Sequence, residues 1–309
     1  SYTRAYVIGK LGFNQNQTIT YNDLNIGIDK LNATQNFKSI SYKLEKSDNN
    51  KENLVLSLKE NEVKNFLKFS IHYDPLYKSA ILTNLTRKKS LTKNDVVSLD
   101  LIFGDNFRYN LDYYIDNGFY TSFGIKSKLN KFNRNISMEF SNNPLFNLSN
   151  VNSLNINFTD LTNQMYIQSV FKQKYSVRTG FEYRHIYLQS ETLTSSNQKS
   201  DFYSGFINLK FDSLDDKYFP TKGFYVSGDF QSYLTPSDFS VKINPFSVAK
   251  GEILVATHFL KKITFKLQSE IGFTVGNRDI PMLNFAFGGY GFNTLPNINI
   301  TYLNQRRHN

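Results

Sequence analysis

The chain has 309 residues, no cysteine and a formal net charge of +10, so disulfides, thiolate metal sites and cysteine nucleophiles are excluded. Its mean hydropathy is negative and it lacks a run of about 18 apolar residues, which excludes a helical membrane span but not a transmembrane barrel of alternating strands. The positive charge is spread along a Lys- and Asn-rich chain without a dense basic run, which favours compositional bias over an anionic partner such as lipid headgroups or nucleic acid.

The first 62 residues mix helical and strand patterns and predict a small α+β domain. Ala5–Leu11 is a short apolar run that we expect to form a strand. Thr20–Asp23 is a capping-box start for a helix, and a shorter helical turn is expected over Thr34–Lys38. Ile40–Leu44 and Leu54–Leu58 alternate as two further strands. The predicted order is β-α-α-β-β, with a three-stranded sheet whose exposed edge either accepts a client strand by β-augmentation or serves packing alone.

From Asn65 onward, one alternating strand follows another. Val97–Phe103 and Phe107–Ile115 alternate on either side of a Gly-Asp-Asn turn. Ile263–Val275 alternates over about 13 residues, whereas strands of soluble proteins centre near about 5–6 residues and tilted membrane strands need about 9–11. Strand length therefore favours a membrane barrel over the alternative, a large soluble β-sandwich.

The hairpin around Asp212–Asp229 organises this plan. Upstream, Tyr203–Phe211 places alternate apolar residues on one face, and Phe224–Phe230 does the same downstream. Pro220 presets φ for the turn between them, and Gly223 can adopt the positive φ that ends it.

The two faces of the predicted strands differ in chemistry, as those of a membrane barrel do. Residues expected on the lipid-facing side are Phe119, Phe123, Tyr175, Phe181, Tyr183, Phe224, Phe230, Phe265 and Phe273. Residues expected on the inner wall are Lys126, Arg178, Glu182, Arg184, Lys266 and Glu270. The connections also differ, because Asp116–Gly118 is tight whereas Gln189–Asp201 and Thr235–Pro245 are long and polar. Short turns on one side and long loops on the other are typical of a barrel with a periplasmic and an external face.

Catalytic and metal-binding patterns are not found in the sequence. The four histidines are His72, His185, His258 and His308, and their spacing is not that of metal ligands. The carboxylates of Asp212, Asp215 and Asp216 form a cluster that suits either Ca²⁺ or, in our preferred interpretation, a turn. Phe287–Phe292 is glycine-rich without a following helix, which favours a loop folded into a barrel lumen over a phosphate site. Neither a catalytic residue nor a cofactor is expected.

Several of these segments resemble the BamA/TpsB superfamily of outer-membrane POTRA-plus-barrel proteins, also called the bacterial surface antigen family. The resemblance rests on Asp216–Gly223, on the Gly288-Gly289 pair and on the N-terminal domain with Ile8-Gly9. Its structural-motif residues in this chain are Asp216, Phe219, Pro220, Gly223, Gly288, Gly289 and Gly291. Tyr6–Leu11, Leu31–Phe37 and Phe158–Gln164 are more closely similar to the C-terminal half of patatin-like outer-membrane proteins of Bacteroidetes, in which a lipase domain precedes one POTRA domain and a barrel.

Two departures from the superfamily pattern concern the C-terminal part. The resemblance implies an Arg-Gly-aromatic triplet after the glycine pair, but Phe292 is followed by Asn-Thr-Leu-Pro-Asn. It also implies sixteen barrel strands, where the sequence shows only about twelve, and Asn297–Asn309 lacks strand patterns. We therefore expect a C-terminus that is truncated or altered. The N-terminus lacks a signal peptide, so the chain is processed, a fragment or not exported.

The sequence thus predicts a mainly β protein with a POTRA-like periplasmic domain over residues 1–62 and an incomplete transmembrane antiparallel β-barrel over 63–309. The resemblance implies a translocator or insertase of the bacterial outer membrane, or the membrane anchor of a patatin-like lipase. The expected partners are outer-membrane lipid and an unfolded client or passenger at the POTRA edge; no nucleic acid is expected, and a homo-oligomer stays open. The alternatives are a phospholipase whose catalytic domain lies outside these residues, and a passive porin-like channel.

Overall fold

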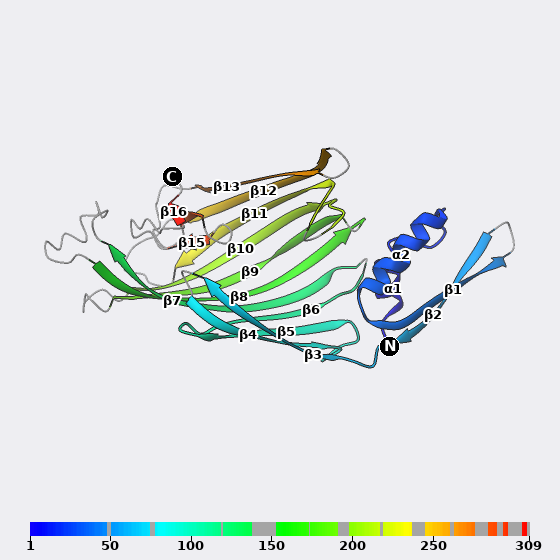
Figure 1. Cartoon of the computed structure of the whole chain (residues 1–309), viewed down its shortest axis with the longest axis horizontal. Helices are drawn as coiled ribbons and strands as arrows, with labels where there is room; N and C mark the ends of the chain where they lie inside the picture. Colours follow the sequence, from blue (N-terminus) through cyan, green and yellow to red (C-terminus); the bar gives the residue numbers. More distant parts are fainter. Residues whose placement is uncertain are drawn as a thin grey trace.

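The computed structural model describes most of the chain as a small N-terminal unit beside a large curved sheet (Figure 1). The described residues are 1–47, 51–74, 78–118, 120–137, 153–172, 174–190, 198–216, 219–236, 245–259, 263–275, 284–288, 293–295 and 305–307. Its described helices are all too short or too polar to cross a membrane. We call residues 1–60 the N-terminal unit; it contains the helices α1 (Arg4–Leu11) and α2 (Tyr21–Ala33) and the paired strands β1 (Phe37–Ser47) and β2 (Lys51–Glu60).

Both helices are delimited by capping residues. In α1, the Thr3 side chain accepts a hydrogen bond from the Tyr6 amide, and Gly12 ends the helix with φ 83°. In α2, Thr20 and Asp23 form the predicted capping box. Leu31 is fully buried and packs with Leu11 and Phe37 in the core of the unit.

Three predictions for this unit are wrong. Ala5–Leu11 is helical rather than extended, because Thr3 and Gly12 cap a helix that includes these residues. The second helical turn is not formed, since α2 ends at Ala33 and β1 begins at Phe37. The described sheet of this unit therefore has two strands, β1 and β2, and not three.

The glycine inside α2 has a packing role, because a Cβ on Gly27 would lie 2.7 Å from the Leu11 carbonyl oxygen.

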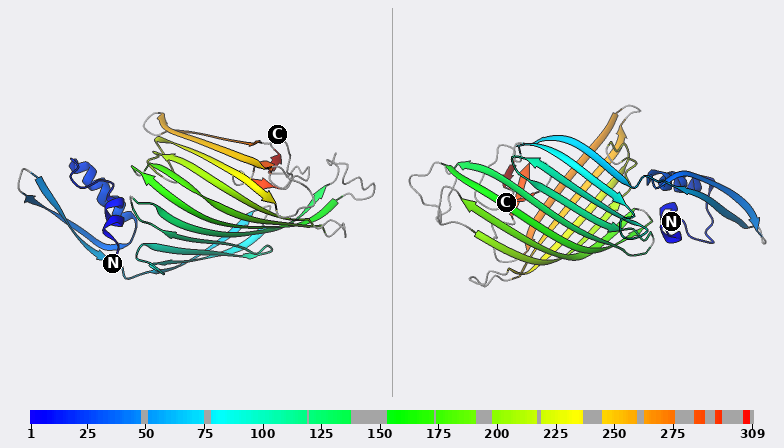
Figure 2. Two further views of the ribbon diagram at one scale, coloured as in Figure 1. Left: turned by 180° about the vertical axis from the view of Figure 1, so that it is seen from behind. Right: turned by 90° about the horizontal axis from the view of Figure 1, so that it is seen from below.

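The large sheet, here called the barrel sheet, has eleven antiparallel strands in the order of the sequence, from β3 to β13. It curls into a barrel-like wall (Figure 2). Its strands are β3 (Asn65–Asp74), β4 (Lys78–Lys88), β5 (Asp95–Gly104), β6 (Arg108–Ile115), β7 (Ser122–Ser137), β8 (Ser153–Phe171), β9 (Tyr175–Ser190), β10 (Gln198–Asp212), β11 (Gly223–Pro236), β12 (Phe246–Phe259) and β13 (Ile263–Val275). Each strand pairs with its sequence neighbours, and the two end strands of the described sheet are β3 and β13. The predicted mainly β architecture is therefore confirmed.

The two faces of the barrel sheet carry the predicted chemistry. On the outer face, large apolar side chains are exposed, including Phe181 at 73% and Phe265 at 57%. On the inner face, Glu182 and Arg184 are buried. Phe119, also predicted for the outer face, lies outside the described residues.

The connections differ between the two ends of the barrel sheet. The N-terminal unit faces the end of the barrel sheet that contains the predicted turn at Asp116–Gly118, and we call this end the mouth. The connections between β9 and β10 and between β11 and β12, which were predicted to be long, lie at the opposite end. The predicted asymmetry is seen only in part: the longest connection of the barrel sheet, between β7 and β8, lies opposite the mouth, but the connection between β10 and β11 at the mouth (213–222) is longer than the two that were predicted to be long.

A separate three-stranded sheet follows the barrel sheet in sequence, with the order β15-β14-β16. Its strands are β14 (Asn284–Gly288), β15 (Asn293–Leu295) and β16 (Gln305–Arg307). Part of the predicted glycine-rich loop is therefore a strand, because Phe287 and Gly288 pair with β16. Gln305–Arg307 likewise forms a short strand where the sequence showed no strand pattern.

Candidate functional site

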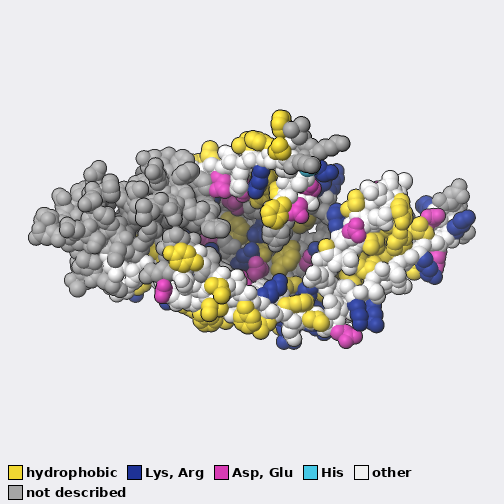
Figure 3. Space-filling model, viewed as in Figure 1, with side chains coloured by type: hydrophobic (Ala, Val, Ile, Leu, Met, Phe, Trp, Pro, Cys, Tyr) yellow, Lys and Arg dark blue, Asp and Glu magenta, His cyan; other side chains and the backbone are white. Residues whose placement is uncertain are grey.

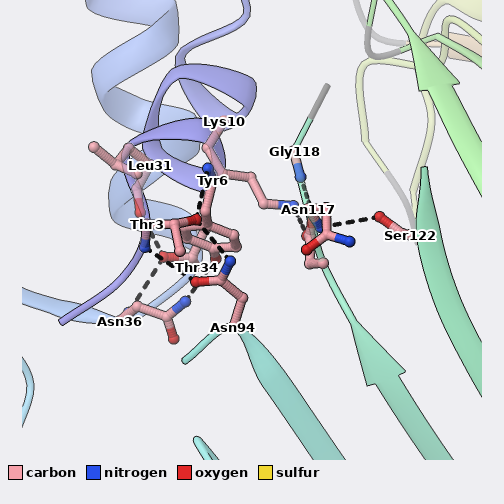
Figure 4. Close-up of polar contacts among 11 residues, drawn as sticks. Thr3, Tyr6, Lys10, Leu31, Thr34, Asn36, Asn94, Asn117, Gly118 and Ser122 are labelled. Carbon is pink, nitrogen blue, oxygen red and sulfur yellow. Dashed lines mark hydrogen bonds and ion pairs between the residues drawn. The ribbon is translucent and has the colours of Figure 1, made fainter. Parts of the chain in front are cut away.

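The N-terminal unit contacts the turns at the mouth through polar groups (Figure 4). Thr3 and Asn94 exchange two hydrogen bonds: the Thr3 amide donates to Asn94 Oδ1 at 3.2 Å, and Asn94 Nδ2 donates to Thr3 Oγ1 at 2.7 Å. Lys10 of α1 forms an ion pair with Asp116, with 2.5 Å between Nζ and Oδ2. These contacts join segments far apart in sequence and thereby orient α1 on the barrel sheet.

Gly118 allows α1 to approach the turn between β6 and β7. Its φ is +70°, and a Cβ at this position would lie 2.2 Å from the Ala5 carbonyl oxygen. The turn is shaped by its own hydrogen bonds, since the Gly118 amide donates to Asp116 Oδ1 at 2.9 Å and the Asn117 amide to Ser122 Oγ at 3.1 Å. A side chain at position 118 would therefore push the helix away from the mouth.

The turn between β4 and β5 is built around one buried carboxylate. Asp95 is 1% exposed, and it accepts hydrogen bonds from the amides of Ser90, Leu91 and Thr92 at 2.6–2.8 Å. The neighbouring Lys88 Nζ donates to the Thr34 carbonyl oxygen at 2.9 Å and to Asn36 Oδ1 at 2.7 Å. The rigid turn thus presents its basic and amide side chains to the N-terminal unit.

Glu60 links the end of β2 to the same turn. It forms an ion pair with Lys89 and accepts a hydrogen bond from the Tyr2 amide at 2.8 Å, while Lys89 Nζ lies 3.8 Å from the centre of the Tyr2 ring. Burial raises the pKa of Glu60, but the bonds from Lys89 and Tyr2 lower it by more, so its net pKa lies below the ordinary value of 4.5. Burial, assisted by the Glu60 charge, raises the pKa of Tyr2 to about 12. Glu60 is therefore ionised and Tyr2 neutral at neutral pH.

The inner wall of the barrel sheet carries a connected polar network. Arg184 and Asp160 form a two-pronged ion pair, with Nε–Oδ1 at 3.0 Å and a terminal nitrogen to Oδ2 at 2.7 Å. Glu182 accepts hydrogen bonds from Gln164 and Gln231, both at 2.6 Å. The network therefore contains one ion pair, Arg184–Asp160, and one carboxylate, Glu182, that accepts hydrogen bonds from neutral amide side chains.

A cavity of about 660 Å³ lies between the N-terminal helices and the inner face of the barrel sheet at the mouth. Basic and acidic side chains are visible in the hollow between the two parts (Figure 3). Tyr166 lines this cavity and is positioned by glycines on both neighbouring strands, since Gly124 and Gly180 are its register partners. A Cβ on Gly124 would lie 2.2 Å from the Tyr166 ring, and a Cβ on Gly180 would lie 2.8 Å from the Tyr166 Cα. Gly124 thus leaves the space in which the ring lies, and Gly180 allows its strand to approach the backbone of Tyr166 closely.

Four of the predicted motif residues lie together in the turn between β10 and β11. The Phe219 amide donates to Asp216 Oδ1 at 2.7 Å, Pro220 is buried, and Gly223 has the predicted positive φ, at +106°. Gly288 lies apart from them at the end of β14. Gly289 and Gly291 lie outside the described residues.

The acidic residues of this turn serve the turn itself. Asp215, which the motif set did not include, accepts hydrogen bonds from the amides of Thr221 and Lys222 at 2.9 and 3.1 Å. Its hydrogen bond with the Thr221 hydroxyl, followed by these amide bonds, lowers the pKa of the Asp215 carboxyl well below its usual range. In the described part of the chain, no group of three or more His, Cys, Asp or Glu side chains could hold a metal ion. His72 and His308 have no described side chains.

Sequence reasoning missed the residues that join the two parts of the chain, above all Thr3, Asn94, Asp116 and Gly118. The Asp-Asn-Gly turn signal at 116–118 was recognised, but turn chemistry alone does not indicate that a helix contacts it. Asp160 was also missed, since its position opposite Arg184 requires knowledge of the strand register.

A family model described as the OMP85 superfamily matches residues 52–303. Similar solved structures include BamA from Haemophilus ducreyi lacking POTRA domains 1–3, at 12% identity and TM-score 0.60, with 94% of this chain and 57% of that chain covered. CdiB from Escherichia coli is 12% identical with TM-score 0.61, covering 93% and 54%. CdiB from Acinetobacter baumannii is 12% identical with TM-score 0.55, covering 94% and 53%.

These likenesses concern the fold, and the chain spans between about half and three fifths of the length of the structures it matches. A comparison with curated proteins finds no significant match. The alignment with BamA leaves 6% of this chain, about 19 of 309 residues, uncovered. Most of the N-terminal unit therefore falls within the aligned part.

Proposed function

Because this chain belongs to the OMP85 superfamily, we propose that it is a β-barrel translocator or insertase of the bacterial outer membrane. In this proposal the outer face of the barrel sheet contacts lipid, and the N-terminal unit is a POTRA-like domain in the periplasm. The unit receives an extended client polypeptide, and the barrel carries or inserts it.

The docking of the N-terminal unit on the end opposite the longest connection of the barrel sheet is the observation that supports this proposal best. Long loops are typical of the external side of outer-membrane barrels, so the docked end is the periplasmic one in this proposal. The contacts of Thr3 with Asn94 and of Lys10 with Asp116 attach the unit to that side. A client bound by the unit would consequently lie next to the mouth.

The surfaces of the two parts suit an extended polypeptide. The hairpin of β1 and β2 has unpaired backbone groups on its outer edges within the described sheet, and such edges can accept an additional strand. Beyond the mouth, Gln164, Gln231 and Glu182 line an inner wall that offers hydrogen-bonding groups. These features favour binding of a polypeptide backbone over recognition of one particular sequence.

The proposal assigns no catalysis to this chain. An attached patatin-like lipase, for which this chain would be the membrane anchor, stays a prediction from the sequence resemblance, and a passive porin-like channel stays an alternative hypothesis. A domain encoded upstream that contains the G-x-S-x-G nucleophile motif of serine hydrolases would support the lipase prediction. Ion conduction unchanged by deletion of residues 1–60 would favour the channel.

Site-specific photo-crosslinking in cells tests the proposal. The full-length protein is produced in a Gram-negative host with a photo-reactive amino acid at Ser57, on the β1–β2 hairpin, or at Gln231, on the inner wall. Crosslinks from both positions to newly exported polypeptides are expected, whereas the same label at Phe265, on the outer face, should capture none. A protein that stays soluble without detergent, or labels that capture no polypeptide at Ser57 and Gln231, would refute the proposal.

A further inference from the structure

The cavity at the mouth has the size of a small-molecule site. Its volume of about 660 Å³ lies within the range of about 300–1,000 Å³ that is typical of ligand pockets. It is bounded by both parts of the protein, so that a ligand inside it would touch the N-terminal helices and the barrel sheet together. The ionisable side chains that line it, tyrosines aside, are Lys10, Lys30, Lys126, Arg178, Asp112 and Asp116.

Two of the four cations in this cavity are already paired with its two carboxylates. Lys10 forms its ion pair with Asp116 at 2.5 Å, and Lys126 lies 3.1 Å from Asp112. Both carboxylates are thereby used. The other two lining cations, Lys30 and Arg178, have no carboxylate partner among the described residues, so the cavity carries an excess of positive charge.

The guanidinium of Arg178 is held in position from two sides. Its Nε donates to Gln168 Oε1 at 2.9 Å, and the guanidinium carbon lies 4.6 Å from the centre of the Tyr166 ring. That ring lies in the space that Gly124 leaves open. Among the described residues, no partner occupies the two terminal nitrogens of Arg178, and a guanidinium fork of this kind suits two oxygens of one anion.

Lys30 approaches the cavity from the opposite side, near the C-terminal end of α2. Burial, and then the charge of Lys174 in the turn between β8 and β9, lowers the pKa of Lys30. The described part of the chain provides no hydrogen-bond or ion-pair partner for its ammonium group. A bound anion would therefore relieve repulsion between like charges at this point.

We propose that this cavity binds a phosphate group, which Arg178 and Lys30 hold from the two parts of the protein. A tetrahedral phosphate has further oxygens for a second cation once two of them occupy the guanidinium fork, whereas a carboxylate would have to share its two oxygens between both cations. The phosphate belongs either to a soluble phosphate ester or to a phospholipid headgroup. The bound group would fasten the N-terminal unit to the mouth, a role that does not depend on the handling of clients.

Binding is measured on the full-length protein in detergent, by calorimetric titration with glycerol 3-phosphate as the soluble ester and with dihexanoyl phosphatidylglycerol as the lipid. Saturable binding of at least one of the two is expected. Binding of the soluble ester identifies a soluble ligand class, and binding of the lipid alone identifies a headgroup site. Hydrogen bonds that involve charged groups are stronger than those between neutral groups, and R178Q and K30Q each remove such bonds to the phosphate. Each variant should therefore weaken binding about tenfold or more.

Lys46→Gln is the matched control, since Lys46 is an exposed lysine of β1 at a distance from the cavity lining. It should leave the affinity unchanged, and all three variants should keep heat-modifiable mobility on gels, which shows that the barrel folds. Absence of saturable binding for both ligands would overturn the proposal. The proposal would also be overturned if R178Q and K30Q bound the ligand with the same affinity as K46Q. Neither result would bear on translocation, because the assay contains no client.

Discussion

Replacing Gly223 by alanine tests the architecture of the hairpin between β10 and β11. Gly223 has φ +106°, a conformation that residues with a Cβ rarely adopt. The added Cβ would also lie 2.3 Å from the Ser213 carbonyl oxygen and 3.0 Å from the Leu214 Cα. The backbone of the turn must therefore move whichever way the new side chain is accommodated.

The expected cost follows from strain and from lost hydrogen bonds. A non-glycine residue in such a conformation costs about 1–3 kcal/mol. The Ser213 amide donates to the Phe224 carbonyl oxygen at 3.0 Å, and the Phe224 amide donates to Ser213 Oγ at 3.0 Å. If the shift weakens one or both bonds, each adds about 0.5–1.5 kcal/mol, so we expect a total destabilisation of about 1.5–6 kcal/mol.

Urea unfolding of the detergent-folded full-length protein, followed by heat-modifiable gel mobility, measures this cost. Gly228→Ala is the matched control, because it lies in the same strand without a positive φ and a Cβ there would meet no heavy atom within 4 Å. Lys222→Ala, exposed in the same turn, is a second control. If Gly223→Ala unfolds at the same urea concentration as Gly228→Ala, the proposed strain in this turn is refuted.

Three further predictions concern the docking of the N-terminal unit and the inner wall. Gly118→Ala should raise the rate of trypsin cleavage after Lys64 several-fold while the barrel stays heat-modifiable; an unchanged rate would contradict the close contact with α1. Because the pKa of Glu60 is lowered on folding, the contribution of Glu60 to docking should be complete above pH about 4.5 and should decline as the pH falls through the folded pKa. The same cleavage assay should show this decline, and Glu60→Gln should remove it. Arg184→Met should destabilise the barrel by about 3–5 kcal/mol in urea unfolding, because it leaves Asp160 charged and unpaired. The double variant Arg184→Met with Asp160→Leu should recover most of this loss. Equal losses for the single and double variants would contradict a buried ion pair.

The sequence predicted several features of the structure that depend on local pattern. The alternation of Phe224–Phe230 and the Pro-x-x-Gly spacing before it predicted a hairpin, and the structure pairs Asp212 with Tyr225 in that hairpin. The caps Thr3 and Gly12 were also present in the sequence, but an apolar run of seven residues fits a strand and a helix alike. The error at Ala5–Leu11 therefore came from weighting apolar content above capping.

Contacts between distant segments could not be predicted in the same way. Asn94 lies 91 residues from Thr3, and no local preference of either residue indicates the other. Arg184 was expected on the inner wall from its alternation, but its pairing with Asp160 depends on the register of β8 against β9. The cavity beside Arg178 likewise exists only because a helical unit and a sheet meet there.

The packing of Tyr166 between two glycines has a consequence for how the sheet assembles. In the native register the ring meets Gly124 on one side, and Gly180 stands opposite it on the other. A slip by one residue would pair Tyr166 with Phe123 or Ile125 of β7, and a larger side chain would then stand where Gly124 now leaves room for the ring. The Tyr166–Gly124 pair thus favours the native alignment of β7 and β8 over its nearest alternatives.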